Sequence, residues 1–164
     1  MYSKDIAHIH ELYDFTTSAF IMHPTDPKLL LLHHIKLNSW LQPGGHIELD
    51  ENPLQALHHE LQEETGLLPA DYDIIEPADH PVTTGTSITL PLPFYVSDHR
   101  FNDTHRHIDS SYLIRSRTET ITVTPDGAHA IGWLTLEEIR SKHAEGVMFD
   151  DTLQICEWIF EHKI

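Results

Sequence analysis

Two short apolar runs near the N-terminus predict a pair of neighbouring strands. The first runs from Phe15 to Met22 and the second from Lys28 to Ile35, and both have the length and apolar character of buried strands. Residues 23–27 between them contain two prolines and an aspartate, which is the composition of a turn. The two strands are therefore expected to form a hairpin.

The strongest pattern in the chain is that of a helix following residue 52. Leu54, Leu57 and Leu61 recur at helical spacing and form an apolar stripe suited to packing on a sheet. Asn52 and the proline after it are typical of a helix start, and Gly66 is typical of a helix end. This segment is expected to be the best-defined helix of the molecule.

The remaining segments complete a chain in which strands and helices alternate. We expect extended chain from Trp40 to Glu48, a strand ending near Trp133, and no internal repeat or linker, so residues 1–164 form one domain of the α/β class. The other predicted elements are a short helix over Asp5–Tyr13, strands over Ser87–Val96 and His105–Arg115, and helices over Leu136–His143 and Asp151–His162, the last two capped by Thr135 and by Asp150 or Asp151.

The charge balance restricts the classes of function. Ten Lys and Arg against 26 Asp and Glu give a net charge of −16, which disfavours binding to nucleic acid. A small anionic substrate is compatible with this charge if a divalent cation is bound beside it. The longest strongly apolar run, Leu29–Leu32, is too short to span a bilayer, so we expect a cytoplasmic protein with no membrane partner. Cys156 is the only cysteine, which excludes an internal disulfide and favours a place in the core.

Three carboxylates occupy one stripe of the central helix. Glu60, Glu63 and Glu64 are spaced i, i+3, i+4, and they repel one another unless a cation lies among them. Oxygen ligands of this kind suit Mg²⁺ or Mn²⁺ better than zinc. The small Ala56 beneath the stripe leaves room for a ligand. A solvated acidic face is the alternative interpretation of the helix taken alone.

The sequence around this helix resembles the signature of the Nudix hydrolases. The corresponding positions here are Gly45, Glu51, and the run His59-Glu60-Leu61-Gln62-Glu63-Glu64-Thr65-Gly66-Leu67, and all but His59 match. The segments Trp40–Glu48 and Trp133–Ile139 also resemble the flanks of that family's domain, so the similarity extends from Phe15 to about Lys142. The resemblance implies a mixed β-sheet sandwiched between helices (α/β/α). It also implies a metal held by the Gly44 carbonyl, Glu60, Glu63 and Glu64, with Glu51 completing the catalytic set.

One position departs from the family signature. His59 replaces the family's arginine, a permanent cation that holds neighbouring glutamates through several donors. Histidine provides this charge only when its pKa is raised, which adjacent carboxylates can do. We therefore expect His59 to act behind the metal ligands as a weaker brace.

Further candidates for substrate binding lie within the signature and beyond it. We count His46 and Glu48 among them, together with His105, His107 and Asp109, which alternate along a predicted strand and so share one face. A solvent-facing side of that strand is the alternative. Asp126 is a weak candidate for a general base, because a Pro-Asp-Gly turn explains it better.

The sequence therefore predicts a Mg²⁺-dependent hydrolase, with Mn²⁺ as a substitute. Its substrate would contain a phosphoanhydride bond, in a nucleoside di- or triphosphate or a small molecule linked to a nucleoside diphosphate. A Nudix-fold module that binds nucleotide with little turnover is the alternative, which the His59 substitution leaves open. An acidic domain with an accidental resemblance is the third hypothesis, and the length of the match makes it remote.

Overall fold

A computed structural model describes residues 12–83, 85–122 and 128–162 of the chain, apart from the side chain of Phe101. Most of the helix predicted over Asp5–Tyr13 lies outside the described residues. Its last residue, Tyr13, belongs to a strand instead, because it pairs with Arg106 in the register of the sheet.

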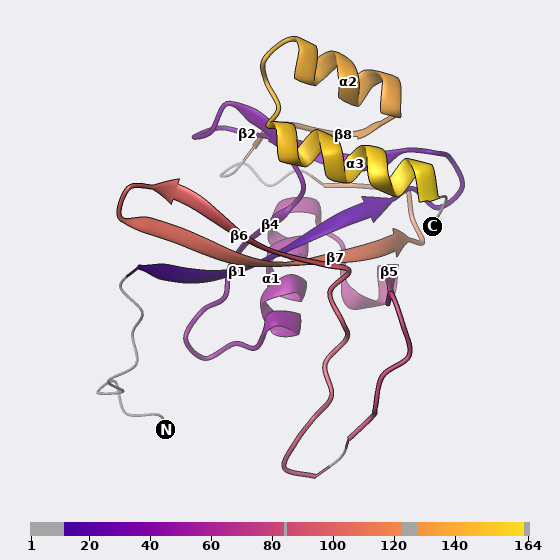
Figure 1. Ribbon diagram of the computed structural model, residues 1–164. Coiled ribbons are helices and arrows are strands. Elements are labelled where there is room, and N and C mark those ends of the chain that lie inside the picture. The colour runs from indigo at the N-terminus through magenta and orange to yellow at the C-terminus, as the bar shows by residue number, and fades with distance from the viewer. Residues whose placement is uncertain (1–11, 84, 123–127, 163–164) are drawn as a thin grey trace.

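A single mixed sheet forms the centre of the molecule (Figure 1). Its longest pairing is parallel, between β1 (Tyr13–Met22) and β7 (His105–Ser116), and all the other pairings are antiparallel. The strand order is β3-β2-β1-β7-β5, with β4 paired to β1, β6 to β7 and β8 to β2. The remaining strands are β2 (Leu29–His34), β3 (Ser39–Leu41), β4 (Gly44–His46), β5 (Tyr72–Ile75), β6 (Tyr95–Asn102) and β8 (Ala128–Leu134).

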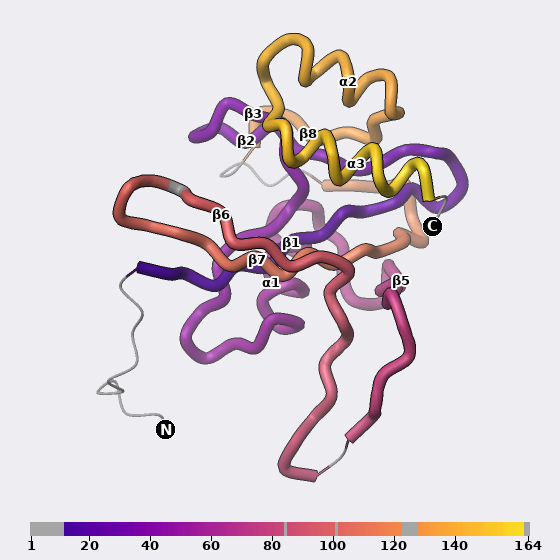
Figure 2. Tube along the Cα trace, viewed as in Figure 1, coloured from indigo at the N-terminus to yellow at the C-terminus, as the bar shows by residue number. Residues whose placement is uncertain are grey.

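Helices cover both faces of this sheet, as Figures 1 and 2 show. Side chains alternate along β1, so Ala19 and Ile21 pack with Leu57 of α1 (Pro53–Thr65). Phe20 and Met22 enter a second core with residues of α2 (Leu136–Ala144) and α3 (Asp150–His162). The predicted α/β/α sandwich and the predicted strands on either side of residues 23–27 are confirmed.

The ends of α1 form as the sequence predicts. The Asn52 side chain accepts hydrogen bonds from the backbone N–H groups of Leu54 and Gln55, each at 3.0 Å. Gly66 adopts φ +76°, a left-handed conformation that costs glycine little. Thr135 caps α2 in the same manner, through Glu138. Cys156 belongs to α3 and is buried in the core between this helix and the sheet, and burial raises its pKa to about 12.

The predicted strand over Ser87–Val96 is wrong for all but its last two residues, since β6 begins at Tyr95. Pro91 and Pro93 cannot donate to a strand ladder. The preceding residues bond locally instead: the Thr89 hydroxyl lies 2.7 Å from the backbone nitrogen of Thr83. Side-chain hydroxyls that satisfy nearby backbone groups compete with strand pairing.

No helix within the described part of the chain is long and apolar enough to cross a membrane.

Candidate active site

Two adjacent glycines bring strand β4 close to helix α1. Gly44 and Gly45 pair with Ser18 and Thr17 of β1. Gly44 has φ +150°, and a Cβ there would collide with the Thr17 carbonyl and with Ser18. A Cβ on Gly45 would collide with the Glu60 carboxylate. The absence of side chains at these two glycines therefore allows the glutamates of α1 to approach the backbone of β4 closely.

Glu60 and Glu64 lie against these glycines and are largely shielded from solvent. The backbone N–H of Gly44 donates to Glu64 Oε2 at 2.8 Å. Burial nevertheless raises the pKa of Glu64 to about 7, with a smaller contribution from the neighbouring glutamates. Burial also raises the pKa of Glu60. The protein thus holds two partly desolvated carboxylates side by side, and a divalent cation would stabilise their charged forms.

The third member of the stripe points elsewhere. The Glu63 side chain is 65% exposed, and its Oε1 lies 2.9 Å from Nε2 of His59. On the other side of the ring, Nδ1 of His59 lies 3.3 Å from Oε1 of Glu51, without the alignment of a hydrogen bond. The hydrogen bond with Glu63 raises the pKa of His59, and the charges of Glu63 and Glu51 add to this. His59 therefore lies between two carboxylates in the position expected of a brace.

These oxygen atoms fit a hard divalent cation. Glu60 and Glu64 supply carboxylates, and the adjacent Gly44 backbone supplies a carbonyl, which are donors that Mg²⁺ and Mn²⁺ accept. Burial raises the pKa of both glutamates, and the charge of the nearby His59 opposes this only in part for Glu60. A divalent ion in this position would stabilise the charged forms of both carboxylates.

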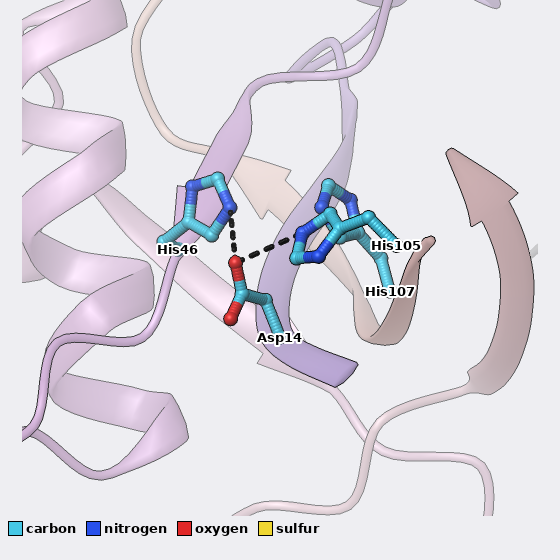
Figure 3. Close-up of side chains that lie close together, drawn as sticks. All are labelled: Asp14, His46, His105 and His107. Atoms are coloured by element: carbon cyan, nitrogen blue, oxygen red, sulfur yellow. Dashed lines mark ion pairs between the residues drawn. The ribbon is translucent and has the colours of Figure 1, made fainter. Parts of the chain in front are cut away.

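The predicted substrate-binding histidines gather on the opposite face of the sheet. Gly45 faces α1, so the next residue, His46, faces away from it. It meets His105 and His107 of β7, and its Nε2 lies 3.4 Å from Oδ2 of Asp14. The same Asp14 oxygen lies 3.0 Å from Nε2 of His105 (Figure 3). Burial and the surrounding imidazoles lower the pKa of His107.

Asp109 and Glu48 do not join this cluster. Asp109 shares the face of His107 but is buried. Its carboxylate accepts hydrogen bonds from the hydroxyls of Thr16, Ser18 and Ser111 at 2.8, 2.7 and 2.6 Å. Glu48 lies exposed in the loop after β4, where its backbone N–H is 3.4 Å from Glu51 Oε2. Both remain predicted contacts of the substrate, and Asp126 lies outside the described residues.

Comparison with known proteins shows which family the chain belongs to. A family model described as the NUDIX domain matches residues 14–152, which include the glycine pair, the acidic helix and the strands β4 and β7 with the predicted substrate-binding histidines. The chain belongs to the NUDIX family. An RNA pyrophosphohydrolase of Stenotrophomonas maltophilia (strain K279a) is 36% identical over 50 residues, which are 30% of this chain and 24% of that protein. The chain thus aligns with about a quarter of the length of the curated relatives it matches.

Solved structures of other proteins share the fold of this chain. A NUDIX-family hydrolase from Clostridium perfringens superposes with a TM-score of 0.75 over 95% of this chain and 100% of its own, at 22% identity. An Ap4A hydrolase from C. elegans gives a TM-score of 0.68 over 88% and 93% of the two chains, at 14% identity. These similarities confirm the α/β/α NUDIX architecture.

Sequence reasoning missed two features beside the NUDIX signature. Asp14 was not foreseen, because its contacts arise from the parallel pairing of β1 with β7, which places it beside His107. The one local indication was that Asp14, Thr16 and Ser18 are polar residues spaced two apart, as on one face of a strand. A cleft of about 330 Å³ between β6 and α3 was also not foreseen, and its walls include Phe94, Tyr95 and Trp158.

Proposed function

We propose that this NUDIX domain is a Mg²⁺-dependent hydrolase of a phosphoanhydride bond in a nucleotide or a small molecule linked to a nucleoside diphosphate. The observation that carries the proposal is the placement of Glu60 and Glu64. Both glutamates are partly buried against the adjacent Gly44 and Gly45, and the pKa of each glutamate is raised. Solvated surface acids show neither burial nor such shifts, so the arrangement favours a cation site over a merely acidic helix face.

Each residue of the signature has a separate task in this proposal. Glu60, Glu64 and the Gly44 carbonyl hold the ion, and Glu63 is available from the exposed edge of the stripe. A bound Mg²⁺ supplies neutralisation of the diphosphate and activation of water. His59 keeps Glu51 and Glu63 in place, which limits the movement of the residues beside the ligands. Mn²⁺ has the same preference for oxygen ligands and is expected to replace Mg²⁺.

The substrate is proposed to be a small molecule. The net charge of −16 opposes a polyanionic partner, whose backbone offers many phosphates and needs many cationic contacts. A nucleotide presents its charge chiefly at one diphosphate, which one bound cation can neutralise. The polar surface of His46, His105 and His107 is assigned to the part of the substrate beyond the reacting diphosphate, together with Glu48 and Asp109. Because the curated relatives are named RNA pyrophosphohydrolases, RNA is included in the test as a competing substrate.

A panel of substrates tests this proposal. Nucleoside triphosphates, ADP-ribose, a dinucleoside tetraphosphate and a 5′-triphosphorylated RNA oligomer are incubated with Mg²⁺, with Mn²⁺ and with a chelator. Released phosphate, pyrophosphate and nucleotide are then measured. We expect metal-dependent turnover of at least one small molecule and little turnover of the RNA. Turnover no greater than that of the Glu60→Gln/Glu64→Gln double variant across the whole panel would contradict the proposal.

A further inference from the structure

Four potential metal ligands from three strands meet on the sheet face opposite α1. Asp14 stands near the start of β1, His46 at the end of β4, and His105 and His107 at the start of β7. The pairings of the sheet account for this meeting. Asp14 is the register neighbour of His107 on β7, and His46 is the register neighbour of Thr16, two residues further along β1. Residues two apart on a strand share a face, so the backbone itself brings the four side chains together.

The spacing of their donor atoms approaches that of a four-coordinate metal site. One potential ligand atom from each residue lies within 4.8 Å of all the others. Two ligands of a tetrahedral zinc ion, each about 2.0–2.1 Å from the metal, are about 3.3–3.4 Å apart. The two separations between Asp14 Oδ2 and the histidine Nε2 atoms, 3.0 Å to His105 and 3.4 Å to His46, are already close to that value. The longer gaps close by small rotations of partly exposed side chains.

Figure 3 shows how the group is arranged. His46 and His105 approach one oxygen of Asp14 from two sides, and His107 lies next to His105. The His107 ring stands edge-on to both other rings, with centroids 5.1 Å from His46 and 4.9 Å from His105. Two imidazoles therefore approach the carboxylate from different sides and the third lies edge-on to both, so the three rings converge without stacking in a single pile.

We infer that Asp14, His46, His105 and His107 form a binding site for a transition-metal ion of the Zn²⁺ class, separate from the carboxylate site on α1. Three imidazole nitrogens and one carboxylate are the ligand set of zinc and its neighbours, whereas Mg²⁺ and Ca²⁺ select oxygen. The two sites also lie on opposite faces of β4, since Gly45 faces Glu60 and His46 faces Asp14. Each site can therefore be filled or removed without altering the ligands of the other.

A second His–Asp pair in the molecule shows what distinguishes this group. His143 Nε2 lies 2.7 Å from Asp150 Oδ1, between α2 and the start of α3. That contact is shorter than either contact of Asp14, but it joins one histidine to one carboxylate. The cluster on the sheet places two imidazoles at a single carboxylate and a third beside them, an arrangement that an ion pair does not require. The His143–Asp150 pair is therefore a matched control.

An ion at the sheet cluster would place positive charge on the surface assigned above to the substrate. The chain carries few cationic side chains for such a purpose, ten Lys and Arg against 26 acids. The metal site itself does not depend on the proposed hydrolase activity, and its test is a measurement of binding.

The experiment measures Zn²⁺ binding to the full chain after removal of metals with a chelator. Millimolar Mg²⁺ is present to occupy the carboxylate site, and Co²⁺ is used in parallel because four-coordinate Co²⁺ absorbs visible light strongly. The proteins are the wild type, Asp14→Asn, His105→Ala, His107→Ala, the Glu60→Gln/Glu64→Gln double variant, and His143→Ala as control. Circular dichroism in chelator establishes that each variant is folded.

The wild type, the double glutamine variant and His143→Ala are expected to bind one Zn²⁺ per chain with the same affinity. Loss of a partner behind the ligands typically costs 10–100-fold in metal affinity, so loss of a direct ligand should cost more than about 100-fold. The Co²⁺ absorption should disappear from the Asp14, His105 and His107 variants. Equal Zn²⁺ affinity in folded His105→Ala and the wild type would overturn the inference. So would a wild-type protein that binds inorganic phosphate through these histidines but binds no Zn²⁺.

Discussion

Replacing Glu64 by glutamine should stabilise the metal-free protein at alkaline pH. Burial raises the pKa of this carboxyl from 4.5 to about 7. In the unfolded chain it ionises near 4.5, so stability is lost as the pH rises from there and the full cost is present above pH 7. At about 1.4 kcal/mol per pKa unit the cost is on the order of 3 kcal/mol. Most of it, about 2–3 kcal/mol, develops between pH 5 and pH 8.

The glutamine side chain keeps an oxygen that accepts from the Gly44 N–H but carries no charge to desolvate. A change of 2–3 kcal/mol shifts the melting temperature of a domain of this size by about 5–10 °C. In the presence of a chelator, the melting temperature of Glu64→Gln relative to that of the wild type should therefore increase by about 5–10 °C between pH 5 and pH 8. Glu161→Gln, which removes an exposed carboxylate near the end of α3, controls for the loss of one charge.

Differential scanning fluorimetry at matched ionic strength measures both proteins. Adding Mg²⁺ at pH 8 should raise the melting temperature of the wild type more than that of the variant, because only the wild type retains the full ligand set. A difference between wild type and Glu64→Gln that is the same at pH 5 and pH 8 would refute the reasoning, since it would mean that Glu64 titrates alike in the folded and unfolded chain.

Three further predictions concern turnover. Gly45→Ala should lower kcat/KM by about 100-fold, because its Cβ displaces the Glu60 carboxylate; unchanged kinetics would show that Glu60 tolerates the movement. His59→Ala should cost about 10- to 100-fold. Because the pKa of His59 is raised by Glu63, wild-type activity should decline as the pH rises through that pKa, and His59→Arg should flatten the decline. Superimposable pH–rate profiles of the three proteins would make His59 a bystander. Mn²⁺ should support turnover while Ca²⁺ binds but supports it poorly, because its larger and looser shell positions water less strictly; equal rates with Ca²⁺ would contradict the metal's proposed task.

Features determined by neighbouring residues were predictable from the sequence. The start of α1 is set by Asn52 and its contacts two and three residues later, and its end by Gly66. The apolar stripe of α1 needed only its own periodicity, and Leu57 and Leu61 are buried as expected. Helical spacing also places Glu63 within reach of His59, four residues earlier in the chain.

Features that depend on distant pairing were not predictable in the same way. The register of β1 against β7 joins residues 93 positions apart, such as Asp14 and His107, and no local pattern fixes that alignment. Glu63 illustrates a second limit. It shares a helical stripe with Glu60 and Glu64, yet its side chain turns toward His59, a choice of rotamer that spacing alone does not reveal. The misplaced strand over Ser87–Val96 reflects hydroxyl bonding within the segment that precedes β6.

The central claim is that Glu60 and Glu64 hold the ion on which hydrolysis depends. It is tested most directly by kcat/KM of the wild type, Glu60→Gln and Glu64→Gln, measured at saturating Mg²⁺ on the best substrate of the panel. A bound ion contributes several kcal/mol to the stabilisation of the transition state, so each variant should lose at least about 1,000-fold while remaining folded. Full turnover by either folded variant would contradict the account.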